Sequence, residues 1–172
     1  RIVINRGSND GLKLGNPIAN DSGILGQVVR IYDRSAEVSL LEDRDFAVPV
    51  QVARNGLRAA VFGAGRGNPL ELRYLPVASD LEVGDVLITS GIDGVYPPGF
   101  AVAVISRIER NADKNSSNVF CVPVAPANRY RQALALLYDP QWDAKASTAN
   151  SKPDAPLTNT PGRRQTRARG MQ

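Results

Sequence analysis

Turn-forming residues interrupt this chain so often that no segment keeps an apolar pattern of helical length and period. Short runs rich in Val, Ile, Leu and Phe are separated by Gly, Asn, Asp and Pro at close spacing. This arrangement is typical of β-strands joined by tight turns. The predicted strands lie near residues 2–5, 16–20, 24–32, 36–42, 47–53, 57–63, 69–76, 85–89, 100–109, 118–125 and 133–138. The sequence therefore predicts an all-β fold built from small barrels or a sandwich.

Two stretches of the chain resemble each other. LKLGNPIANDSG (12–23) and LEVGDVLITSG (81–91) share a Leu-x-[Leu/Val]-Gly start, an apolar strand and a Ser-Gly turn. In each, a turn with Gly15 or Gly84 starts a strand, and a later glycine reverses the chain. The resemblance predicts two similar β modules.

We predict two small β-barrel modules of about five to six strands each. The first covers residues 1–64, and the strand near 133–138 is a candidate to complete it. The second covers residues 65–142, with the boundary near the glycine-rich GAGRGNP at 63–69.

Residues 143–172 differ in composition from the rest, being rich in Ala, Ser, Thr, Asn and Pro with few large apolar residues. Such a segment buries too little surface to offset its conformational entropy, so we predict a disordered tail. Residues 144–172 hold six basic side chains against one acidic, whereas the other 143 residues are close to neutral. The arginines are compatible with attraction to nucleic acid or an anionic membrane surface, but we interpret the segment as a solubilising tail and expect no nucleic-acid partner.

Catalysis by serine is disfavoured because the chain contains no histidine. Ser90 in TSGIDGVYPPGF and Ser22 in NDSG resemble nucleophile turns, but each needs a base within hydrogen-bond reach. Only Lys13 and Lys114 lie outside the tail, and neither forms a recognisable Ser-Lys pattern. Cys121 is the one cysteine, so no disulfide forms within the chain, and its apolar run NVFCVPV predicts a buried thiol. We predict no catalytic residues, no metal and no cofactor.

Two further motifs contain residues suited to binding an anion or a metal ion, but each also has a simpler interpretation as a turn. GAGRGNP offers glycines and Arg66 for an anion, but a strand-like run follows it where a phosphate loop needs a helix. LLEDRDF groups Glu42, Asp43 and Asp45, which are suitable ligands for Ca²⁺ or Mg²⁺. No second carboxylate cluster supports that group. We interpret GAGRGNP as a hairpin or interdomain turn. We interpret LLEDRDF as a solvated turn.

With catalysis and metal or anion binding disfavoured, a surface that binds other macromolecules is the remaining source of function. Tyr96, Pro97, Pro98 and Phe100 place aromatic and apolar groups in or beside a turn that is otherwise polar. Aromatic residues are enriched at protein interfaces, so these four are the predicted partner-binding residues. Phe100 alone is also compatible with a core position at the start of the next strand.

Several motifs together resemble the extracytoplasmic domain of the MreC family of rod shape-determining proteins. They are NRGSNDGLKLGNPIANDSGILGQVV, LEDRDFAVPVQVARNGLRAAVFGAG, LELRYLPVASDLEVGDVLITSG and GVYPPGFAVAVISRIER. They follow one another in the family's order from about residue 3 to residue 138, so the resemblance covers nearly all of the predicted folded part.

The resemblance implies two small β-barrels on the periplasmic face of the bacterial inner membrane and no enzymatic activity. It implies a scaffold of the elongation complex that organises and activates lateral peptidoglycan synthesis. Implied partners are the elongation-specific class B penicillin-binding protein (a transpeptidase), MreD, and further copies of the chain as a homodimer or filament. Because the chain opens at Arg1 with a strand, we expect an upstream membrane helix and coiled coil in the parent protein, and membrane contact only through that helix. A degenerate serine-hydrolase-like double barrel and a peptidoglycan-binding module remain open as alternatives.

Overall fold

The computed structural model describes residues 1–76, 79–110, 117–125 and 132–139. These residues form eleven strands and one short 3₁₀ helix, η1 (Ser8–Asp10). The strands are β1 (Ile2–Ile4), β2 (Pro17–Ala19), β3 (Ile24–Ile31), β4 (Ala36–Leu40), β5 (Ala47–Val52), β6 (Arg58–Phe62), β7 (Leu70–Arg73), β8 (Val86–Thr89), β9 (Ala101–Arg110), β10 (Ser117–Pro123) and β11 (Leu134–Ala135). Each strand overlaps one of the predicted runs, and the all-β prediction is confirmed.

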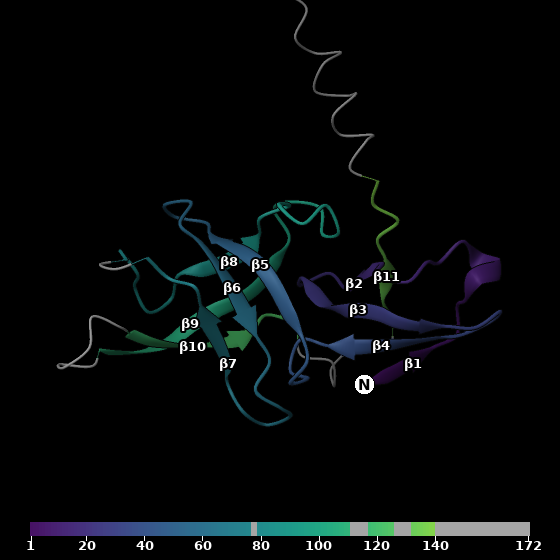
Figure 1. Ribbon diagram of the computed structural model, residues 1–172, viewed down its shortest axis with the longest axis horizontal. Helices are drawn as coiled ribbons and strands as arrows, with labels where there is room; N and C mark the ends of the chain where they lie inside the picture. The colour runs from purple at the N-terminus through teal and green to yellow at the C-terminus, as the bar shows by residue number, and fades with distance from the viewer. Residues whose placement is uncertain (77–78, 111–116, 126–131, 140–172) are drawn as a thin grey trace, which may run out of the picture. The chain divides into compact units, whose positions relative to one another are not determined.

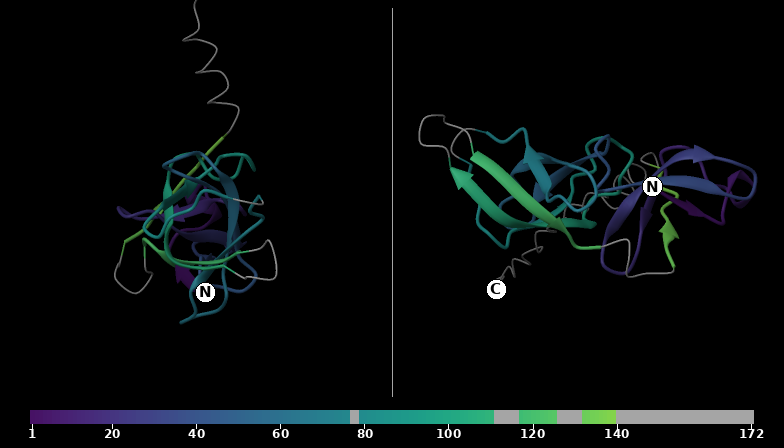
Figure 2. Two further views of the ribbon diagram at one scale, coloured as in Figure 1. Left: turned by 90° about the vertical axis from the view of Figure 1, so that its left-hand side faces the viewer. Right: turned by 90° about the horizontal axis from the view of Figure 1, so that it is seen from below.

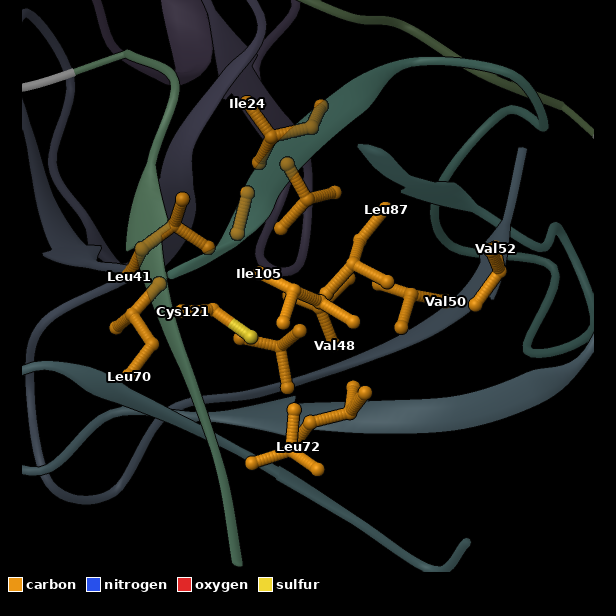
Figure 3. Close-up of a cluster of buried hydrophobic side chains, with 14 of the residues drawn as sticks. Ile24, Leu41, Val48, Val50, Val52, Leu70, Leu72, Leu87, Ile105 and Cys121 are labelled. Atoms are coloured by element: carbon orange, nitrogen blue, oxygen red, sulfur yellow. The ribbon is translucent and has the colours of Figure 1, made fainter. Parts of the chain in front are cut away.

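Six strands close into a barrel in the order β10-β7-β6-β5-β8-β9, with antiparallel neighbours throughout (Figure 1). β9 and β10 form the longest pair, visible as the green ribbon in Figure 2. Strict alternation directs every second side chain inward, so Val48, Val50 and Val52 of β5 are fully buried. Figure 3 shows these valines in the barrel core together with Leu70, Leu87 and other apolar side chains.

The other five strands form a sheet in the order β1-β4-β3-β2-β11, with β1 and β11 at its two edges (Figure 1). Its core contains Ile18 of β2 and Val28 of β3, with Ile2 of β1 packed against them. Residues from strands far apart in the strand order share this core, so the sheet must curl around it.

The division into modules differs from the predicted one. β5 and β6 were predicted to belong to the first module, but their hydrogen-bonded neighbours are β8 and β7, which places them in the closed barrel. The glycine-rich stretch at 63–69 is therefore a hairpin within that barrel, and the chain passes between the sheets at the turn 41–46. The strand near 133–138 does join the first sheet, as β11 beside β2. The predicted disordered tail, 143–172, lies outside the described residues.

The two resembling sequence stretches fold into the same turn. In the first sheet, the Lys13 N–H donates to Asn16 Oδ1 at 2.7 Å and the Asn16 N–H donates to Lys13 O at 3.2 Å. In the closed barrel, the Glu82 N–H donates to Asp85 Oδ2 at 3.0 Å and the Asp85 N–H donates to Glu82 O at 3.1 Å. The glycine before each Asn or Asp has a positive φ, +86° at Gly15 and +97° at Gly84, a conformation that glycine adopts without steric cost.

No described segment forms a helix with the length and apolar character needed to cross a membrane.

Candidate partner-binding surface

The TSGIDGVYPPGF stretch is a firmly hydrogen-bonded connection between β8 and β9. Thr89 at its start is completely buried. Its hydroxyl donates to Pro97 O at 2.6 Å and accepts the Phe100 N–H at 2.9 Å. Asp93 Oδ1 accepts the backbone N–H groups of Val95 and Tyr96 at 3.1 and 3.2 Å. Thr89 and Asp93 therefore fix the path of this loop. The sequence did not indicate this role for either residue.

Tyr96 lies inside the closed barrel rather than at an exposed tip. Its side chain is 2% exposed and belongs to the core cluster, against which half-buried Phe100 also packs. Burial and, to a lesser degree, the nearby Asp93 charge raise the pKa of the Tyr96 hydroxyl. The ring is thus unavailable to a partner, and of the predicted residues only Pro98 is exposed, with Pro97 half-buried. Partner binding at these two prolines stays a prediction.

The two candidate nucleophiles lie in separate turns. Ser90 Oγ accepts the Ile92 N–H at 3.5 Å, at the start of the β8–β9 connection. Ser22 Oγ lies 3.4 Å from Asp21 Oδ1, in the turn between β2 and β3. Neither contact is with the lysine that a Ser-Lys mechanism requires.

Cys121 is a core residue of β10, as predicted. The side chain is fully buried among the apolar residues of the closed barrel (Figure 3). Burial raises the pKa of its thiol to about 12. Because the thiolate is the reactive form, burial and the raised pKa disfavour reaction of this cysteine in the folded protein.

The glycine-rich stretch and the acidic stretch meet at one end of the closed barrel. A Cβ at Gly63 would lie 2.0 Å from the backbone oxygen of Asp43, so only glycine fits there. Asp43 accepts hydrogen bonds from Ser39 Oγ at 2.9 Å and the Leu40 N–H at 3.0 Å, and it thereby stabilises the turn after β4. In the described part of the chain, no three carboxylate or cysteine side chains are grouped to hold a metal ion.

The outer surface of the closed barrel carries a row of aromatic and charged side chains. Strand register places Phe62 opposite Glu71, Glu71 opposite Phe120, and Phe120 opposite Arg107, across β6, β7, β10 and β9. Since Val61, Leu72 and Cys121 point into the core, their neighbours in sequence point outward. We call Phe62, Arg73, Tyr74, Arg107 and Phe120 the aromatic–arginine face.

Arginine guanidinium groups lie over two of the aromatic rings of this face. Arg73 Cζ is 4.8 Å from the centroid of the Phe62 ring, and Arg107 Cζ is 4.5 Å from that of Phe120. Tyr74 packs edge-on against Phe62 with a centroid separation of 5.6 Å. Cation–π and edge-to-face contacts of this kind preorganise the side chains before any partner arrives.

Tyr74 is the most accessible member of the face. Its side chain is 78% exposed, and among the described residues it alone combines a side chain with a positive φ, +61°. Such a backbone conformation is unusual for a bulky residue. An exposed ring at such a φ makes Tyr74 a candidate for partner binding.

Carboxylates accompany both arginines. Arg73 pairs with Glu71 at 2.6 Å and Arg107 with Glu109 at 3.1 Å. These exposed pairs contribute little to stability, and each places a carboxylate beside a guanidinium that also lies over a ring. The face therefore combines apolar area with oriented donors, the composition found at interaction hot spots.

A second charged cluster lies at the turn between β5 and β6. Arg54 donates to Asp85 through Nε at 2.8 Å and Nη2 at 3.0 Å, and to Asp80 through Nη1 at 2.8 Å. The hydrogen bonds from Arg54 lower the pKa of Asp85 despite the opposing effect of burial. This cluster fastens the segment before β8 to the barrel, so we assign it a structural role.

Comparison with known proteins agrees with this architecture. Residues 1–136 match the family model described as rod shape-determining protein MreC, barrel core. The chain belongs to the MreC family. The resemblance inferred from the sequence motifs is thereby confirmed.

MreC from Escherichia coli K12, a cell shape-determining protein, is 37% identical over 150 residues. That match covers 87% of this chain and 40% of the relative, so the chain spans less than half of the relative's length. The crystal structure of MreC from Pseudomonas aeruginosa is 40% identical with a TM-score of 0.75, covering 79% of this chain and 88% of that one. A complex between penicillin-binding protein PBP2 and MreC from Helicobacter pylori contains the same fold at 19% identity, with a TM-score of 0.56 over 68% of this chain and 73% of that one.

Proposed function

We propose that this chain is the barrel portion of a non-enzymatic scaffold that maintains cell shape at the periplasmic face of the inner membrane. Membership of the MreC family supports the cell-shape role. The scaffold organises and activates lateral peptidoglycan synthesis by protein–protein contact, and it needs no cofactor.

The aromatic–arginine face is the observation that carries this proposal. Its partner is the elongation-specific class B penicillin-binding protein, in keeping with the complex described for the Helicobacter pylori MreC. Tyr74 and the ring of Phe62 supply apolar contact area, and the outward edges of Arg73 and Arg107 supply donors for carboxylate or carbonyl groups of the transpeptidase.

Activation follows from differential affinity. A scaffold that contacts one conformation of the transpeptidase more tightly than another increases the population of the favoured conformation. The rigid barrel, with its rings already oriented, limits the entropy lost on binding. Contacts with MreD and self-association into a homodimer or filament complete the proposed assembly, and the membrane is reached through a segment outside this chain.

The proposal is tested by measuring the affinity of this chain for its cognate class B penicillin-binding protein. The substitution Tyr74→Asn removes the exposed ring and suits the positive φ. We expect the dissociation constant to rise about tenfold or more, since an interface aromatic typically contributes about 1–2 kcal/mol or more.

Tyr32→Asn serves as the matched control. Tyr32 is also an exposed tyrosine, at 49%, but it follows β3 in the first sheet. The control is expected to leave affinity unchanged. Equal losses in both variants, or no loss with Tyr74→Asn while the chain still binds, would contradict the assignment of the partner surface to the aromatic–arginine face.

A further inference from the structure

The turn between β5 and β6 contains the only asparagine in the sequence that is followed by glycine, Asn55-Gly56. Glycine has no side chain to hinder its backbone nitrogen, and this nitrogen can attack the side-chain amide of a preceding asparagine. Asparagine is therefore counted among the thermolabile residues. An Asn-Gly pair is a chemically weak point of a chain unless the fold restrains it.

The β5–β6 turn is open to water and uncrowded. Asn55 and Gly56 are both exposed. A Cβ at Gly56 would have no atom within 4 Å apart from its neighbours in the chain. Burial and steric hindrance therefore do not protect the Asn-Gly pair.

Hydrogen bonds hold both of the groups that would react. Asn55 Nδ2 donates to Asp80 O at 2.8 Å and to Asp80 Oδ2 at 3.4 Å. Asn55 Oδ1 accepts the Leu57 N–H at 3.0 Å. The Gly56 N–H donates to Val52 O at 2.8 Å. While these bonds persist, the side-chain amide is held toward Asp80 and the Gly56 nitrogen is engaged with the end of β5.

The position of Asp80 beside the turn depends on Arg54. The Asp80 carboxylate accepts from Arg54 Nη1 at 2.8 Å, and its backbone oxygen accepts from Nη2 at 3.3 Å. Asp80 is itself exposed. Exposed ion pairs contribute little to stability, so the contact between Asp80 and the turn opens more readily than the strands on either side of the turn.

We propose that Asn55 is a deamidation site whose rate is controlled by its contact with Asp80. When the contact opens, the Gly56 nitrogen forms a bond to Asn55 Cγ and the Cγ–Nδ2 bond breaks, which gives a succinimide. The Gly56 amide proton leaves with the side-chain nitrogen as ammonia. Water then opens the ring at either carbonyl and leaves aspartate or isoaspartate at position 55.

The product cannot restore the contact. Arg54 already faces three carboxylates at 2.8, 3.9 and 2.8 Å, those of Asp80, Glu82 and Asp85. Deamidation adds a further negative charge beside this cluster, which the existing carboxylates repel. It also replaces the Nδ2 donor with an acceptor that cannot bond to Asp80 O. The modification therefore loosens the segment 79–85 before β8.

Mass spectrometry of the 172-residue chain, incubated at neutral pH and physiological temperature, tests the proposal. The rate of deamidation at Asn55 is compared with the rate in a peptide of residues 50–60, which has the same local sequence without the fold. We expect the folded chain to deamidate about tenfold more slowly or less than the peptide. Equal rates in the folded chain and the peptide would overturn the proposal.

Asp80→Ala is the decisive variant, because it removes the carboxylate and leaves the sequence around the Asn-Gly pair unchanged. We expect deamidation at Asn55 to become about threefold faster or more. Glu71→Ala is the matched control, since Glu71 also pairs with an exposed arginine of the closed barrel but lies opposite Phe62, at the far end of β6 from the turn. An unchanged rate in Asp80→Ala, or an equal increase in both variants, would contradict control by Asp80.

Asn55→Asp tests the consequence, because it introduces the charge of the product directly. We expect the amides of Glu82 and Asp85 to exchange with solvent several-fold faster than in the parent chain. The amides of Lys13 and Asn16, in the corresponding turn of the first sheet, should exchange as before. Unchanged exchange at Glu82 and Asp85 would overturn the predicted loosening of this segment.

Discussion

In the first sheet β1 pairs with β4 as β7 pairs with β10 in the closed barrel, with Ile2 and Ile4 at the places of Leu70 and Leu72, yet these inward-facing side chains are not equally buried. Leu70 and Leu72 lie in a sealed core, while Ile2 and Ile4 at equivalent positions are partly exposed. All four are large aliphatic residues, so hydrophobicity does not explain the difference. β7 lies between β10 and β6, whereas β1 is an edge strand of its sheet, so Leu70 and Leu72 have a second neighbouring strand to cover them.

A second contrast concerns the shared turn. Both copies use an Asn or Asp side chain to accept a backbone N–H, but only in the closed barrel is that side chain held by an arginine. Asp85 is 7% exposed, and an ionised carboxylate at that depth requires a compensating charge. Neutral Asn16 in the first sheet has no such requirement.

The largest expected effect comes from truncating equivalent core positions. Leu70→Ala should lower the free energy of unfolding by about 3 kcal/mol, because the substitution leaves a cavity in a sealed core. Ile2→Ala should cost about 1 kcal/mol, since the side chain is already partly solvated. Urea denaturation of both variants measures the difference, and equal losses would contradict the contrast in closure.

A smaller effect is expected from exchanging the turn residues. Asp85→Asn should cost about 1–2 kcal/mol, because Arg54 loses a charged partner at a partly solvated site. Asn16→Asp should change stability by less than about 0.5 kcal/mol. Thermal denaturation at neutral pH compares the two, and a larger loss for Asn16→Asp would reverse the assignment of the charged cluster to the barrel.

The Asp85→Asn variant also gives a pH test. The pKa of Asp85 is lowered in the folded chain, with the hydrogen bonds from Arg54 as the main cause. Its stabilising effect is therefore complete above the ordinary aspartate pKa of about 4 and is lost as the pH falls through the lower folded value. Below about pH 4 the stability of the parent chain should fall more steeply than that of Asp85→Asn, and parallel curves would exclude Asp85 from acid unfolding.

The smallest effect on stability is expected from replacing the turn glycine, and it should be the same in both sheets. Gly15→Ala and Gly84→Ala should each lower the free energy of unfolding by about 1 kcal/mol, because alanine is strained at a positive φ. Neither site has a close steric obstacle, since the nearest atom to a Cβ at Gly15 is 3.7 Å away and nothing lies within 4 Å at Gly84. Losses that differ by more than about 0.5 kcal/mol would argue against an equivalent turn.

The strands were predictable from sequence because alternation and turn residues act locally. Their allocation to sheets was not, because it depends on pairings between distant segments, such as Val50 of β5 with Thr89 of β8. The glycines at 63–69 marked a turn correctly, but a hairpin within a barrel and a boundary between modules have the same local composition.

The candidate surface was less predictable than the fold. Tyr96 lies in a turn, where no alternation indicates whether a side chain points inward or outward. Phe62, Tyr74 and Phe120 belong to three separate segments, and only strand register and ring packing bring them onto one face. The run LELRY did carry a signal, because Glu71 and Arg73 alternate with inward-facing leucines and so mark the outward side of β7.

We propose that the closed barrel presents its aromatic–arginine face to the transpeptidase. Photo-cross-linking tests it most directly, with the reactive group placed in turn at Asn118 and Arg58, exposed positions of β10 and β6, and at Val3 and Val29 in the first sheet. We expect cross-links to the cognate class B penicillin-binding protein from the two barrel positions and none from the two sheet positions. Cross-links from the first sheet alone would contradict it.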